Sequence, residues 1–210
     1  AFALVFEKGT RIIEKSYDRD ALEKDYAVRD FAVQVKGDRR TLRRFPKENR
    51  GANAKNLLLS TVEGVGLGAL GIGLPDIVLF VGMLLKGIYE TALRYGFPYE
   101  DPAEQMWILR MMETALTKGP LWTEKNQGVD AFLYQGLMEE PTKEALSQQI
   151  QATAQTFAMD MLVLKFIQGL PLVGALGGAA NPVYYRRVLN YVQLKYHKRY
   201  LYQKRREMAP

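Results

Sequence analysis

An apolar, glycine-rich run at residues 64–85 constrains this chain more than any other stretch. Its only ionisable residue is Asp76, and five glycines precede Pro75. About 20 apolar residues are enough to span a bilayer as one helix. Pro75 interrupts such a helix because it has no backbone N–H and its ring clashes with the preceding turn. The sequence therefore predicts two short apolar helices hinged at 74–76, either buried in a helical protein or inserted into a membrane.

The residues after the hinge carry helix-start and helix-end signals. Asp76 can accept a hydrogen bond from a free backbone N–H and so cap a helix over 77–95. Gly96 is placed to end that helix in a left-handed conformation. Asp101 and Pro102 then predict the start of a further helix over 103–118.

A second apolar, glycine-bearing segment at residues 167–180 repeats features of the first. Gly-Leu-Pro occurs at 73–75 and again at 169–171, and both segments contain glycines four residues apart. Small residues at this spacing let two helices approach closely. Paired broken segments of this kind can surround a central binding site. One interpretation is thus a ligand site between two Pro-broken hairpins, and the simpler one makes Asp76 only a helix cap; the candidate ligand-binding residues are Asp76, Lys165 and Asn181.

The rest of the chain shows helical periodicity and almost no strand pattern. Residues 1–36 form a helical segment with interruptions at Gly9 and at 16–18, and residues 119–130 have the composition of a loop. These patterns predict one all-α domain over 1–210, with about seven helices around the two apolar hairpins. Besides those already described, the expected helices cover 131–139, 142–168 and 183–208.

Composition narrows the possible chemistry. The chain has no cysteine, which removes disulfides, zinc–thiolate sites and cysteine nucleophiles, and its one histidine, His197, lies in a basic segment. No phosphate-binding glycine loop follows a strand, and no His-Glu-x-x-His motif occurs. The sequence indicates no catalytic residue, no metal site and no cofactor. A hydrolase that uses Asp76 ranks last among the function classes.

Positive charge gathers in two parts of the chain, whose net charge is +6. The final helix has eight Lys or Arg and no acid between 184 and 206, interleaved with tyrosines, and the connection at 37–50 is also basic. Basic residues near an anionic membrane contribute about 1 kcal/mol each, and tyrosine prefers the headgroup level. We expect an anionic surface to contact Arg39, Arg40, Arg43, Arg44, Arg186, Arg187, Lys195, Lys198, Arg199, Lys204, Arg205 and Arg206.

Three environments compete for the basic helix. It can lie on a membrane, bind nucleic acid through phosphates and stacking, or pack by its tyrosines against the rest of the protein. The membrane ranks above nucleic acid because the apolar hairpins have no role in nucleic-acid binding.

Taken in order, the motifs resemble those of the EcsC family of bacterial proteins, over roughly residues 57–202. The family is named for a gene beside the two components of an ABC transporter, and its biochemical function is not established. The resemblance implies an all-helical fold, a loose link to membrane or transport biology, and no catalytic residue. The matching residues are Gly73-Leu74-Pro75-Asp76, Tyr95-Gly96, Asp101-Pro102, Leu170-Pro171, Gly174, Gly177, Asn181 and Arg199.

These observations favour a non-enzymatic, membrane-associated accessory protein at the cytoplasmic face of the membrane. We expect it to bind anionic lipid surfaces through the basic helix, with room for a lipid or apolar ligand between the hairpins. The alternative is a soluble helical module that binds a protein partner such as a transporter subunit. The sequence leaves the oligomeric state and the ligand open.

Overall fold

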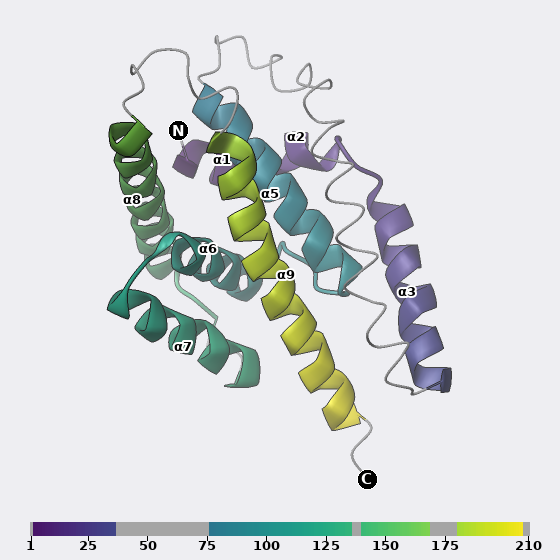
Figure 1. Ribbon diagram of the computed structural model, residues 1–210. Coiled ribbons are helices and arrows are strands. Elements are labelled where there is room, and N and C mark those ends of the chain that lie inside the picture. The colour runs from purple at the N-terminus through teal and green to yellow at the C-terminus, as the bar shows by residue number, and fades with distance from the viewer. Residues whose placement is uncertain (1, 37–75, 136–139, 169–179, 208–210) are drawn as a thin grey trace.

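The computed structural model describes residues 2–36, 76–135, 140–168 and 180–207. Every regular element in these ranges is an α-helix, which confirms the all-helical prediction (Figure 1). The helices are α1 (Phe2–Lys8), α2 (Thr10–Glu14), α3 (Arg19–Lys36), α5 (Asp76–Arg94), α6 (Pro102–Leu116), α7 (Pro120–Gln135), α8 (Lys143–Gln168) and α9 (Ala180–Glu207).

The long helix α9 extends along much of the length of the molecule (Figure 1). It packs against α5, α6 and α7, while α8 lies against α6 and α3 lies against α5. The approach of α5 to α9 is close at Gly87, where a Cβ would lie 2.7 Å from a methyl carbon of Leu189. A glycine at this position therefore sets the distance between the two helices.

Aromatic side chains form the core between α5, α6 and α9. Tyr95 and Tyr196 stack with ring centroids 6.2 Å apart, and Trp107 meets Tyr196 edge-on at 5.1 Å. These three side chains and Tyr200 are all buried. Several tyrosines of the basic helix thus pack the protein's own interior, which was one of the three environments considered for that helix.

Two helix ends follow the signals in the sequence. Gly96 has a φ of +79°, and the Phe97 N–H donates to the Ala92 carbonyl at 2.9 Å, which ends α5 as expected. Asp101 accepts a hydrogen bond from the Ala103 N–H at 2.7 Å, and Pro102 is the first residue of α6. Both predicted caps are confirmed.

The interruptions of the N-terminal helical segment and the start of helix α8 were also predicted correctly. The N-terminal segment is divided into α1, α2 and α3 at Gly9 and at residues 15–18. Helix α8 begins at Lys143, where the Thr142 hydroxyl accepts the Ala145 N–H at 3.1 Å.

The prediction of a loop at residues 119–130 was wrong, because α7 covers Pro120–Gln135. Gly119 has a φ of +69° and Pro120 follows it, so the chain turns and starts a helix at once. The buried residues of α7 are Val129, Phe132 and Leu133, which lie on one face, while most of the rest of the helix is exposed. Its polar composition marks a solvated helix face and not a loop.

Most of the two predicted hairpins lies outside the described residues. Helix α5 is the second arm of the first hairpin, but its first arm and the Pro75 hinge are outside, as are residues 169–179 of the second hairpin. Within the described ranges, no helix is both long enough and apolar enough to cross a membrane.

Candidate functional site

The basic residues of α9 meet carboxylates that come from four different helices. Helix α8 supplies Asp160, α7 supplies Asp130, α6 supplies Glu104 and α3 supplies Asp30. Each of these four helices thus contributes one acid that pairs with basic residues of α9. Three of the four acids lie far from their partners in sequence: Asp130 is 65 positions from Lys195, Glu104 is 95 from Arg199, and Asp30 is 174 from Lys204.

Glu104 is the most buried of these acids. Tyr196 donates its hydroxyl to Glu104 Oε1 at 2.6 Å, and Arg199 Nη1 lies 2.6 Å from Oε2. The Arg199 guanidinium carbon lies 4.0 Å from the centre of the Phe97 ring and 5.0 Å from that of Trp107. Burial raises the pKa of Glu104 and Arg199 opposes this rise, while burial and Glu104 raise the pKa of Tyr196, which keeps its phenol protonated as a donor.

Asp30 makes a similar set of contacts at the far end of α9. Lys204 Nζ lies 2.8 Å from Asp30 Oδ1 and 2.9 Å from Oδ2, and Tyr200 donates to Oδ1 at 2.8 Å. Gln34 donates to Oδ2 at 2.8 Å. Lys204 is buried, and Asp30 is its main counter-charge. This lysine is therefore occupied inside the protein.

The two remaining acids hold the middle and the beginning of α9. Asp130 lies 2.6 Å from Lys195 Nζ and 3.0 Å from Lys198 Nζ. Arg187 lies 3.5 Å from Asp160 and donates to the Thr117 carbonyl at 3.1 Å. Of the eight basic residues between 184 and 206, five thus have an acid partner within the protein, and the other three, Arg186, Arg205 and Arg206, are exposed.

Replacing Asp130 with asparagine should lower the stability of the protein at neutral pH. The variant should also lose less stability than the natural protein when the pH is lowered. Burial raises the pKa of Asp130, but the hydrogen bonds from Lys195 and Lys198 outweigh burial and the net pKa is lowered. The stability from this carboxylate is therefore present above the unfolded pKa of about 3.9 and lost as pH falls through the lower folded pKa. Thermal melts of both proteins between neutral pH and pH 3 should converge at the acid end.

The control for this prediction is Glu124→Gln on the same helix, because Glu124 is exposed. It should leave the melting temperature and its pH dependence unchanged. A constant difference between Asp130→Asn and the natural protein over the whole pH range would contradict the expected linkage.

Two of the three exposed cations of α9, Arg205 and Arg206, lie in its last turn, at the same end of the molecule as an apolar stripe on α3. The rings of Tyr26 and Tyr200 are 6.4 Å apart and Asp30 meets Lys204, so the last turns of α3 and α9 lie at the same end of the molecule (Figure 1). On the outer side of α3, three side chains at helical spacing are largely exposed: Val28 (69%), Phe31 (67%) and Val35 (66%). We name these three residues, with Arg205 and Arg206, the α3–α9 end.

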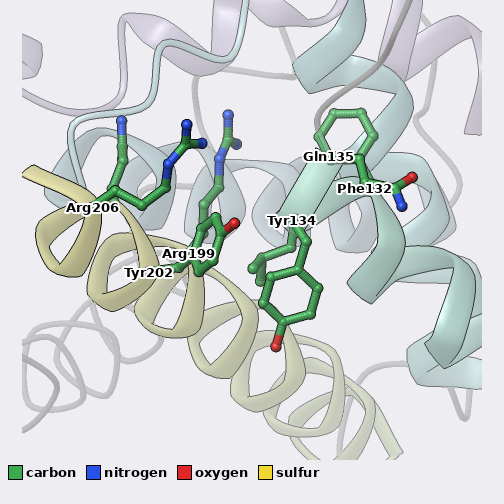
Figure 2. A pocket seen from close by; sticks show the side chains of 8 residues that line it. Phe132, Tyr134, Gln135, Arg199, Tyr202 and Arg206 are labelled. Carbon is green, nitrogen blue, oxygen red and sulfur yellow. The ribbon is translucent and has the colours of Figure 1, made fainter. Parts of the chain in front are cut away.

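A pocket of about 230 Å³ lies between the last turns of α7 and of α9. Figure 2 shows Arg199 and Arg206 extending from the same side of α9 toward the space beside α7. The Tyr134 and Tyr202 rings meet edge-on at 5.0 Å, one from each helix. The pocket is lined by Phe132, Leu133, Tyr134, Gln135, Arg199, Tyr202, Gln203 and Arg206.

The sequence model of the EcsC protein family matches residues 1–201. The chain belongs to the EcsC family. The resemblance over residues 57–202 is thus confirmed, and the family match also includes the N-terminal helices. Comparisons with curated proteins and with solved structures gave no match. Membership in the EcsC family therefore assigns no activity, and any function has to be argued from the geometry.

Several residues that the sequence singled out in this EcsC-family protein fall outside the described part. Arg39, Arg40, Arg43 and Arg44 belong to residues 37–75, which the structure does not describe. The other group has a helical backbone but undescribed side chains, so its proposed meeting stays a prediction; it comprises Asp76, Lys165 and Asn181.

The acids that balance α9 were not recognised from the EcsC-family sequence. Glu104 lies in the first turn of α6, where an acid also favours the helix N-terminus without any tertiary partner. A signal was available, because Glu104 shares a helix face with Trp107 and Ile108, three and four residues later, and both are buried. An acid on the apolar face of a helix requires a cationic partner.

Proposed function

We propose that this EcsC-family protein is a non-enzymatic peripheral protein that attaches to anionic lipid surfaces through the α3–α9 end. The observation that carries the proposal is that Arg205 and Arg206, exposed and without an ion pair in the described ranges, lie at the same end of the molecule as three exposed apolar side chains of α3. Amphipathic helices that lie in a membrane interface combine these two features.

The distribution of side chains around α3 supports attachment through the outer face of this helix. Leu22, Asp30 and Val33 face the protein interior, so the opposite side of the helix holds Val28, Phe31 and Val35. Soluble monomers rarely group large apolar side chains on one exposed face without a partner for them. A lipid surface accepts apolar side chains and attracts the neighbouring guanidinium groups through its charge.

The proposal narrows the expected set of lipid-binding residues. Lys195, Lys198, Arg199 and Lys204 have acid partners inside the protein, and moving them to a membrane would leave those acids without counter-charges. Of the described cations of α9 at this end, Arg205 and Arg206 are therefore the two that can meet headgroups.

Co-sedimentation with vesicles tests the proposal. Each arginine near an anionic surface contributes about 1 kcal/mol, so Arg205→Gln with Arg206→Gln should weaken binding to phosphatidylserine–phosphatidylcholine vesicles about 30-fold. The control pair, Arg186→Gln with Arg11→Gln, removes the same charge from exposed residues away from this end. Along α9, Arg186 lies about 28 Å from Arg205. The control should bind like the natural protein.

The apolar half of the surface requires its own variant. Phe31→Ser should also weaken vesicle binding by about tenfold or more, because a buried aromatic side chain contributes roughly 1.5–3 kcal/mol. Leu194→Ser is the matched control, since Leu194 is 61% exposed on α9. Equal losses for both charge pairs, or no binding of the natural protein to anionic vesicles, would reject attachment by the α3–α9 end and favour a protein partner.

A further inference from the structure

We infer that the pocket between α7 and α9 binds a phosphate monoester group. This pocket is separate from the apolar stripe of α3, and a phosphate group can bind there whether or not the protein attaches to a membrane. Such a group can belong to a small soluble molecule or to the headgroup of a lipid. Its chemistry is the same in both cases, so the pocket is assigned to the group and not to one carrier.

The two arginines of the pocket supply the charge. Arg199 and Arg206 are two turns apart on one face of α9, about 10.5 Å along the axis, and both line the pocket (Figure 2). A guanidinium has five N–H donors in a planar fork that suits the oxygens of a phosphate. Two such forks on the same side of a helix can hold one group between them.

One of the two arginines of the pocket has an acid partner, and the other has none in the described ranges. Arg199 contacts Glu104 through Nη1 and keeps a side chain that is 24% exposed, while Arg206 lies 5.8 Å from the centre of the Tyr202 ring without an ion pair in the described ranges. Among the described residues that line the pocket, none is acidic. A phosphate dianion would therefore meet one guanidinium without an acid partner in the described ranges and one shared with Glu104, and no carboxylate from these lining residues.

The rest of the lining indicates what kind of molecule carries the phosphate. Gln135 and Gln203 offer amide groups that can bind hydroxyls or further phosphate oxygens, and Tyr134 and Tyr202 form an aromatic rim. The volume of about 230 Å³ is smaller than that of most sites for drug-sized ligands. The site thus fits a phosphate on a short polar carrier, such as a glycerol or sugar unit.

The binding test uses glycerol 3-phosphate and inorganic phosphate with the full-length protein, followed by NMR of its labelled amide groups. Saturable shifts are expected at the side-chain amides of Gln135 and Gln203. Arg206→Gln should weaken binding about tenfold or more, because a charged hydrogen-bond donor is lost. Arg205→Gln removes the same charge from the next exposed residue, which does not line the pocket, and should have no effect.

A second variant changes the α7 wall of the pocket, so a loss of binding there cannot arise from a disturbance of α9. Gln135→Glu places a negative charge in the pocket and should abolish binding, whereas Gln127→Glu on the exposed part of the same helix should not. The absence of saturable shifts with either phosphate compound, or equal losses for Arg205→Gln and Arg206→Gln, would overturn the proposal.

Vesicles then separate the two sources of the phosphate. Vesicles with phosphatidic acid, which has a terminal phosphate, are compared with phosphatidylserine vesicles of equal surface charge. A lipid ligand predicts that Arg206→Gln loses more affinity for phosphatidic acid than Arg205→Gln does. If the ligand is soluble, Arg205→Gln and Arg206→Gln should lose the same affinity for each kind of vesicle. Only Arg206→Gln should then lose glycerol 3-phosphate binding. Attachment by the α3–α9 end can fail in vesicles while the pocket still binds glycerol 3-phosphate, so the two proposals are tested separately.

Discussion

Replacing Glu104 with alanine is expected to lower the free energy of unfolding by about 3 kcal/mol. The variant removes the carboxylate that accepts the Tyr196 hydroxyl and faces Arg199, each at 2.6 Å. A buried hydroxyl then loses its partner, and a guanidinium stacked on Phe97 and Trp107 loses its counter-charge. The lower end of the usual range applies because the Arg199 side chain is 24% exposed and keeps some contact with water.

Thermal unfolding measures this loss. For a domain of this size, about 3 kcal/mol corresponds to a fall of roughly 6–12 °C in Tm. Glu124→Ala is the control because Glu124 is an exposed glutamate, and it should change Tm by little. A Tm of Glu104→Ala equal to that of the control would show that the Glu104–Arg199 pair does not stabilise the fold.

The triple variant Glu104→Leu, Tyr196→Phe and Arg199→Met separates pairing from burial. It replaces the polar cluster with apolar groups, and such replacements are often neutral or stabilising where the single loss is costly. We expect this variant to be more stable than Glu104→Ala. If it is equally unstable, the loss arises from the shape of the site and not from an unpaired charge.

The helix boundaries were predictable because their signals are local. Asp101 with Pro102, Thr142 and Gly96 each act on backbone groups within a few residues, so their effect can be recognised without knowing the fold. The same reasoning failed for α7, where polar residues of a solvated helix resembled those of a loop. Only its tertiary contacts, through Val129, Phe132 and Leu133, reveal the face that makes it a helix.

The charge pairs of α9 were not predictable in this way because they are non-local. Asp30 and Lys204 are 174 positions apart, and Glu104 and Arg199 are 95 apart. A basic helix without acids in its own sequence looks like an anion-binding surface, although its counter-charges arrive from other helices. The candidate functional surface is consequently smaller than the sequence indicated, and it is defined by the cations that remain exposed.

Because only some cations of α9 are paired inside the protein, this one helix can serve both stability and binding. Tyr196, Arg199 and Tyr200 hold the C-terminal half of α9 against α6 and α3 by buried or partly buried hydrogen bonds. Fixed helices position binding groups better than loops do. Arg206, one turn or more beyond these anchors, is then presented to solvent at a defined place beside α7.

The second large effect is expected for Trp107→Ala, which should lower the free energy of unfolding by about 3–5 kcal/mol. Trp107 is fully buried and donates its indole N–H to the Val129 carbonyl at 3.1 Å. Its ring stacks on Phe132 with centroids 5.4 Å apart and meets Tyr196 edge-on. One side chain thus joins α6, α7 and α9, and its removal leaves a cavity where the three helices meet.

The second tryptophan of the chain provides the control. Trp122 also belongs to α7 but is 39% exposed, so Trp122→Ala should cost less than about 1 kcal/mol, as is usual for surface sites. The milder Trp107→Phe keeps an aromatic ring and loses the indole hydrogen bond, so its cost should lie between the two alanine variants. Fluorescence adds an independent check, because the emission that remains in Trp122→Ala should come from a buried indole and shift to shorter wavelength. Equal destabilisation by the two alanine variants would mean that α7 does not depend on Trp107 for its contact with α6 and α9.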